Sequence, residues 1–131
     1  MNLSGYSRQF GEGPDAGPVG ELIERTRVYL QEAELKDKSV YFDEPNMVVY
    51  VTTAFGVFVV SIDETQRYGA QLTPWQGISG CSLKLTTTPA SARIVTVSIE
   101  SLDATLTEPV GEPAAPLLGF FRECVKRSRP W

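Results

Sequence analysis

The segment from Met47 to Ile62 places the strongest constraint on the fold, because it is apolar on both faces of a predicted hairpin. Met47–Thr53 and Val57–Ile62 consist almost entirely of strand-forming residues, and a short connection joins them. A surface hairpin alternates apolar and polar side chains, because neighbouring residues of a strand point to opposite faces. Burying one valine or phenylalanine stabilises a fold by roughly 1.5–3 kcal/mol, so we expect both faces to be covered.

Three arrangements would cover both faces of this hairpin. Helices of the same chain pack on opposite faces, the sheet curls into a roll, or another subunit covers the second face. The last arrangement makes the hairpin an interface, because large exposed apolar patches usually mark interfaces. The residues proposed for that interface are Val48, Tyr50, Phe58 and Val60.

The remaining pattern predicts further strands and two helices, and therefore an α+β fold. The strands expected besides the hairpin are 39–43, 81–86, 95–100 and a short one at 102–106. One helix is predicted from Pro18 to about Lys38, and a second from Ala115 to Arg127. Short connections favour one antiparallel sheet of five or six strands, open or curled into a roll, flanked by an N-terminal and a C-terminal helix.

Residues 1–18 are predicted to be an extended arm in front of a single α+β domain, residues 19–131. The arm contains four glycines and two prolines, which oppose both helix and strand. Its two large aromatic residues, Tyr6 and Phe10, are candidate anchors for docking on a partner. The alternative is a disordered tail in which these aromatic residues have no role.

Residues 63–80 are predicted to be a long irregular segment, because glycines and Pro74 interrupt any regular pattern. Such segments are often functional, and Trp, Tyr and Arg anchor many interfaces. The candidate partner-binding residues of the 65–80 loop are Arg67, Tyr68, Gln71, Trp75 and Gln76. The alternative is that Trp75 packs over the end of the sheet as part of the core. A further candidate is the basic C-terminal sequence 126–131, which ends in Trp131.

The sequence offers little for catalysis. It has no histidine, which excludes Ser-His-Asp and Cys-His arrangements. The adjacent carboxylates Asp63 and Glu64 follow a strand and point to opposite sides, and neither Cys81 nor Cys124 has a neighbouring base in the sequence. No phosphate-loop, dinucleotide-binding or metal-ligand spacing occurs. We therefore expect no catalytic residue, no metal site and no cofactor.

The charge balance bears on partners. The net charge is −4, which opposes non-specific binding to nucleic acid or to an anionic membrane. Residues 1–64 carry 11 acidic and 5 basic residues, whereas residues 65–131 carry 5 acidic and 7 basic ones, an asymmetry that would orient copies of the chain. No apolar segment reaches the roughly 18 residues of a membrane span, and no signal-peptide pattern is visible. Free cysteines suit a reducing compartment, so we expect a cytoplasmic location or one inside a particle assembled there.

These observations favour a non-enzymatic interaction or assembly subunit of a larger complex or particle. It would contact a protein partner, or copies of itself, through the arm, the sheet face and the 65–80 loop. A structural protein of a virion or phage, an adaptor or a chaperone would fit. In size, acidity and flanking helices the chain is similar in outline to class I type III secretion chaperones, although that family has a helix where this chain has GAQLTPWQGISG.

Two other functions remain open. The first is a small module that binds a ligand or peptide, because a curled six-stranded sheet closed by a C-terminal helix is similar in outline to PH-like rolls. Its pocket would be lined by Phe58, Trp75 and Leu85, with the 65–80 loop at the edge. The other is an enzyme that uses carboxylate chemistry.

Overall fold

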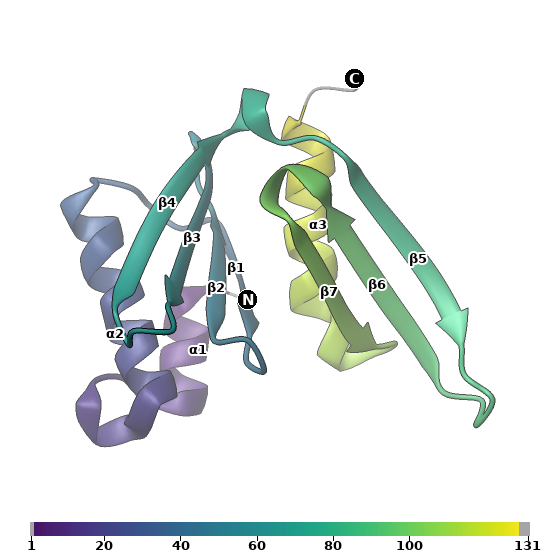
Figure 1. Cartoon of the computed structure of the whole chain (residues 1–131), viewed down its shortest axis with the longest axis horizontal. Helices are drawn as coiled ribbons and strands as arrows, with labels where there is room; N and C mark the ends of the chain where they lie inside the picture. Colours follow the sequence, from purple (N-terminus) through teal and green to yellow (C-terminus); the bar gives the residue numbers. More distant parts are fainter. Residues whose placement is uncertain (1, 129–131) are drawn as a thin grey trace.

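The computed structural model describes residues 2–128 and contains three α-helices and two antiparallel sheets (Figure 1). The α-helices are α1 (Leu3–Phe10), α2 (Gly17–Glu32) and α3 (Ala115–Arg127). The first sheet has the order β1-β2-β3-β4, and its strands are β1 (Ser39–Asp43), β2 (Val48–Thr52), β3 (Gly56–Ile62) and β4 (Tyr68–Pro74). The second has the order β5-β6-β7, and its strands are β5 (Cys81–Thr87), β6 (Arg93–Ile99) and β7 (Ala104–Pro109). Four 3₁₀ turns connect these elements: η1 (Pro14–Ala16), η2 (Trp75–Gly77), η3 (Glu100–Leu102) and η4 (Glu112–Ala114).

The α+β class and the antiparallel pairing are confirmed, whereas the prediction of one sheet of five or six strands is wrong. The four-stranded and three-stranded sheets are separate because β4 pairs only with β3, and β5 pairs only with β6. Between β4 and β5 the chain passes through η2 and then Gly80, whose φ of +70° suits glycine. This connection carries the chain away from the first sheet before β5 begins (Figure 1).

The prediction of an extended arm is also wrong, because residues 3–10 form the helix α1. The Asn2 side chain caps it by accepting a hydrogen bond from the Gly5 N–H at 2.8 Å, and Gly11 ends it with a φ of +83°. Leu3 and Tyr6 lie on its buried face. A helix this short is unstable alone, so packing against the rest of the protein must stabilise it despite its glycine.

The two sheets and three helices form layers. Helices α1 and α2 lie on one side of the four-stranded sheet, and α3 lies on the other side, between the two sheets (Figure 1). Two apolar cores result. The outer core joins α1 and α2 to the first sheet and includes Leu22, Ile23 and Phe58. The inner core joins α3 to both sheets and includes Leu117 and Phe120.

Both faces of the 47–62 hairpin are therefore covered by the chain's own helices. The strand register places Val51 opposite Phe58 and Val49 opposite Val60, so these four side chains share the outer core. Tyr50 lies in the inner core instead, and Val48 packs against it. The prediction that Val48, Tyr50, Phe58 and Val60 form one interface face is wrong, because the register divides them between two cores.

Among residues 2–128, no helix combines the length and the apolar character needed to cross a lipid bilayer.

Candidate functional site

The residues of the predicted 65–80 loop do not form one surface. Residues 68–74 are the edge strand β4, so the prediction that 63–80 is irregular is wrong for these residues. Arg67 lies in the preceding turn, where its N–H donates to the Asp63 carboxylate at 3.0 Å, and Gln71 is exposed on β4. Tyr68 begins β4 and Trp75 directly follows it, so at about 3.3 Å per residue the two aromatic residues stand roughly 23 Å apart.

Those two aromatic residues also pack in different cores. Tyr68 packs against the outer core, and the Arg25 guanidinium lies over its ring at 5.3 Å. Trp75 packs against the inner core, and its indole N–H donates to the Thr53 carbonyl at 3.0 Å. The Trp75 side chain thus closes the end of the first sheet, as in the alternative interpretation. Gln76 is exposed in η2 beside it.

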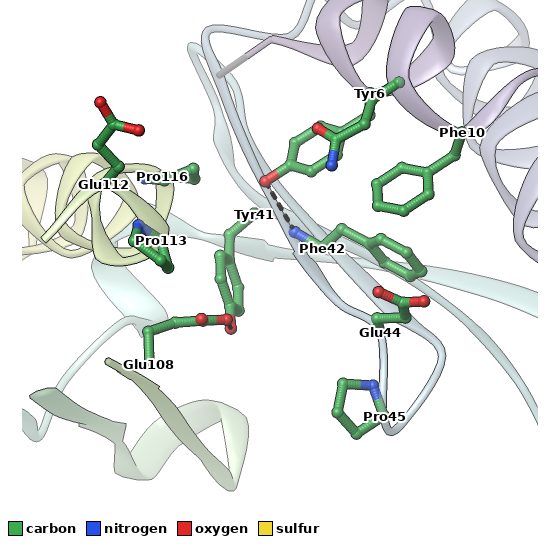
Figure 2. Close-up of a pocket in the computed structure, with 11 residues that line it drawn as sticks. Tyr6, Phe10, Tyr41, Phe42, Glu44, Pro45, Glu108, Glu112, Pro113 and Pro116 are labelled. Atoms are coloured by element: carbon green, nitrogen blue, oxygen red, sulfur yellow. Dashed lines mark hydrogen bonds between the residues drawn. The ribbon is translucent and has the colours of Figure 1, made fainter. Parts of the chain in front are cut away.

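The two aromatic residues of the predicted arm lie together on α1 and face the protein itself. The rings of Tyr6 and Phe10 are stacked with centroids 6.3 Å apart. Both rings meet Phe42 of β1 edge-on, Tyr6 at 6.2 Å and Phe10 at 5.6 Å. The Phe42 N–H donates to the Tyr6 hydroxyl oxygen at 3.3 Å (Figure 2). The hydroxyl thus provides an acceptor for a backbone N–H of the edge strand β1, which has no neighbouring strand on its outer side.

A cavity of about 520 Å³, here called the β1 pocket, opens beside these aromatic residues (Figure 2). Its walls come from α1, β1 and the turn after it, the end of β7, and the start of α3. Its aromatic wall consists of Tyr6, Phe10, Tyr41 and Phe42. Three prolines add further apolar surface. The sequence had indicated Tyr6 and Phe10 as candidate residues, but on an extended arm.

Three glutamates also line the β1 pocket: Glu44, Glu108 and Glu112. Glu108 accepts a hydrogen bond from the Tyr41 hydroxyl at 2.8 Å, and this bond ties the two sheets together. Glu44 and Glu112 are exposed, and in the described part of the chain no lysine or arginine lines the pocket. The ion pairs between described residues, Glu12–Arg27 and Glu123–Arg127, lie elsewhere. The pocket is therefore both aromatic and acidic.

A second feature is the outer edge of the three-stranded sheet, here called the β5 edge and defined by residues 81–87. The register aligns Leu83 with Val97 and Leu85 with Val95, so these leucines continue the apolar face that α3 covers on β6. The helix leaves both side chains exposed, Leu83 by 38% and Leu85 by 62%. The β5 edge thus combines a strand that has no neighbour on its outer side (Figure 1) with two exposed leucines.

The buried hydroxyls of Tyr41 and Tyr50 and the buried thiol of Cys124 are held in their neutral forms. Burial raises the pKa of Tyr41, and its hydrogen bond to Glu108 raises it further. Burial also raises the pKa of Tyr50 to about 12 and the pKa of the Cys124 thiol well above its usual range. These hydroxyls and this thiol therefore stay protonated at neutral pH, which opposes a nucleophilic role. Residues 2–128 hold no cluster of metal-ligating side chains.

The pocket of the PH-like alternative is not formed. Phe58 belongs to the outer core, Trp75 closes the end of the first sheet, and Leu85 lies on the second sheet. These three side chains therefore do not line a common cavity. The last residues of the basic C-terminal candidate, 129–131, lie outside the described part of the chain.

Comparison with known proteins gives no relative: no protein-family model matches the chain, and neither a curated protein nor a solved structure is significantly similar to it.

Proposed function

We propose that the protein is a non-enzymatic interaction subunit that assembles with a second copy of itself through the β5 edge. The observation that supports this function is the pairing of an open strand edge with two leucines that α3 leaves uncovered. An edge strand offers unpaired N–H and C=O groups, and natural proteins usually shield such edges. A second chain that adds a strand there would satisfy these groups and cover the leucines.

The sequence of β5 favours a second copy as the added strand. In an antiparallel pair around a two-fold axis at Leu83, each Leu83 faces the other, and each Leu85 faces a Cys81. Lys84, the charged residue of β5, then faces Ser82 on the polar side of the sheet. If the two-fold axis lay at Lys84 instead, the two Lys84 side chains would face each other, and their like charges would repel. One register therefore joins the apolar residues and separates the charges.

The sheets of the two copies would join into one six-stranded sheet with both α3 helices on the same side. Such a contact buries mainly one strand and two leucines from each copy, which is small for a permanent dimer. We therefore expect a concentration-dependent dimer in exchange with the monomer. The adjoining apolar face on β6 stays covered by α3 throughout.

Sedimentation equilibrium over a range of protein concentrations tests this proposal. The wild-type chain should show a monomer–dimer equilibrium, and the double variant Leu83→Lys/Leu85→Lys should remain monomeric. Thr86→Lys is the control, because it adds a lysine to the same strand on the polar side. A wild-type monomer at every concentration, or a dimer that the double variant leaves intact, would contradict the proposal.

The second candidate function is ligand binding, and the β1 pocket is the observation that favours it. A volume of about 520 Å³ falls within the range of roughly 300–1,000 Å³ of small-molecule sites. Its chemistry is argued below.

A further inference from the structure

The charge of the β1 pocket is uncompensated by the residues around it. Glu44 reaches it from the turn after β1, Glu108 from β7 and Glu112 from η4, so two distant parts of the chain bring carboxylates to one cavity (Figure 2). Among residues 2–128, no lysine or arginine lines the cavity, and the ion pairs Glu12–Arg27 and Glu123–Arg127 do not involve these glutamates. Like charges gathered in this way repel one another, and a cation in the cavity would relieve that repulsion.

The aromatic wall distinguishes this cavity from an ordinary patch of surface carboxylates. Tyr6 is 6% exposed and Tyr41 is 3% exposed, and both line the cavity together with Phe42 and the half-buried Phe10. Faces of aromatic rings attract organic cations, and together with the prolines they also accommodate an apolar stem. A small hydrated metal ion gains little from such walls, because it prefers a shell of oxygen ligands.

The Tyr6 hydroxyl is a second, independent feature of the site. This side chain is more than nine-tenths buried, and its hydroxyl accepts the Phe42 N–H. Among the hydrogen bonds of residues 2–128 the hydroxyl oxygen takes part only in this one, so its second lone pair can accept an N–H from a ligand in the cavity.

We propose that the β1 pocket binds an organic cation, namely an ammonium or guanidinium group carried on an apolar stem. The cationic group lies among the glutamates, and the stem packs against the aromatic and proline side chains. Two sources share this chemistry: a free amine, and a lysine or arginine side chain of a peptide. The site is separate from the β5 edge and does not depend on the dimer proposed above.

Isothermal titration calorimetry on the full chain tests the proposal with three probes at low salt. Pentylamine represents a free cation, a blocked Gly-Arg-Gly peptide represents a basic side chain, and 1-pentanol represents the stem without charge. We expect pentylamine, the peptide or both to bind, the binding to weaken as salt is added, and pentanol to bind much more weakly. The probe that binds more tightly identifies the source.

The variant Glu44→Gln/Glu112→Gln locates the site. Both glutamates are exposed, so the fold should survive, and circular dichroism checks this. Loss of charge-assisted contacts should weaken cation binding about tenfold. Glu32→Gln/Glu64→Gln removes the same charge from exposed positions outside the pocket and should leave binding unchanged.

Phe10→Leu keeps the bulk of the wall but removes its ring, and cation binding should fall severalfold. No binding of either cation, equal binding of pentanol, or equal losses in the pocket variant and its control would overturn the proposal.

Discussion

Tyr6 offers a direct test of whether residues 3–10 belong to the folded domain. Its side chain is 6% exposed, its ring meets Phe42 at 6.2 Å, and its hydroxyl accepts the Phe42 N–H. Tyr6→Ala removes the ring and the acceptor together. Truncating a buried aromatic residue usually costs about 3–5 kcal/mol. Because the ring borders the β1 pocket, water can fill part of the space, and we expect the lower end, about 3 kcal/mol.

Tyr6→Phe separates the hydrogen bond from the packing. It keeps the ring and removes the acceptor of one backbone N–H, so we expect a loss of about 1 kcal/mol. Urea denaturation, followed by circular dichroism and tryptophan fluorescence, gives the free energy of unfolding for each variant. Ser4→Ala, at an exposed position of the same helix, is the control and should change the free energy by less than about 0.5 kcal/mol. A Tyr6→Ala variant as stable as this control would refute the packing of α1 and restore the extended arm.

Three further predictions concern the rest of the fold. Gly56→Ala should lower the free energy of unfolding by at least about 2 kcal/mol, because a Cβ there would collide with the backbone of β4; Gly69→Ala on β4, where that space is open, should cost under about 1 kcal/mol. Tyr50 has a folded-state pKa raised to about 12, so the stability that it contributes is present below about pH 10 and is lost as the pH rises through 12. Tyr50→Phe should therefore flatten the loss of stability in alkaline urea titrations. A thiol reagent should modify the half-buried Cys81 of the native protein well before the buried Cys124, whose pKa burial raises, and unfolding should make the two rates similar.

The sequence predicted the elements whose side-chain pattern is strong. The alternation in 81–86 and 95–100 corresponds to β5 and β6, and the apolar spacing of 115–127 corresponds to α3. In β6 and α3 the local pattern and the final packing agree, because one face of each is buried in the inner core, whereas β5 keeps its alternation although its leucines stay exposed. The two-sided hairpin likewise indicated that layers would lie on both of its faces.

The elements that the sequence missed are those that depend on distant contacts. Helix α1 contains Gly5 and is too short to form alone, so its stability comes from packing against β1 and α2. Strand β4 contains Gly69 and ends at Pro74, residues that oppose a strand in the middle of a sheet. An edge strand tolerates both, and β4 is paired on one side only.

The β1 pocket could not be predicted for a similar reason. Glu108 and Glu112 are four residues apart, but Glu44 lies more than 60 residues before them, and no local pattern joins it to them. The three line one cavity only because the second sheet returns to β1, where the Tyr41 hydroxyl donates to Glu108 at 2.8 Å. The aromatic residues Tyr6 and Phe10 carried the one local signal, a pair four residues apart, and that signal does not distinguish anchors for a partner from a wall of the protein's own cavity.

The two proposed sites are close enough for a weak electrostatic influence and too far apart for direct contact. Leu85 on β5, Val95 on β6 and Glu108 on β7 occupy one cross-strand row, so the β5 edge lies about two strand spacings, or roughly 10 Å, from a carboxylate of the pocket. That separation is about one Debye length at 0.1 M salt. A lysine at position 85 should therefore weaken cation binding slightly at low salt and have no effect at 1 M salt, whereas Thr86→Lys, on the opposite side of the sheet, should have less effect at either. An effect of Leu85→Lys that persists at high salt would instead mean that the dimer contact and the pocket share a structural change. The two sites would then not be independent of each other.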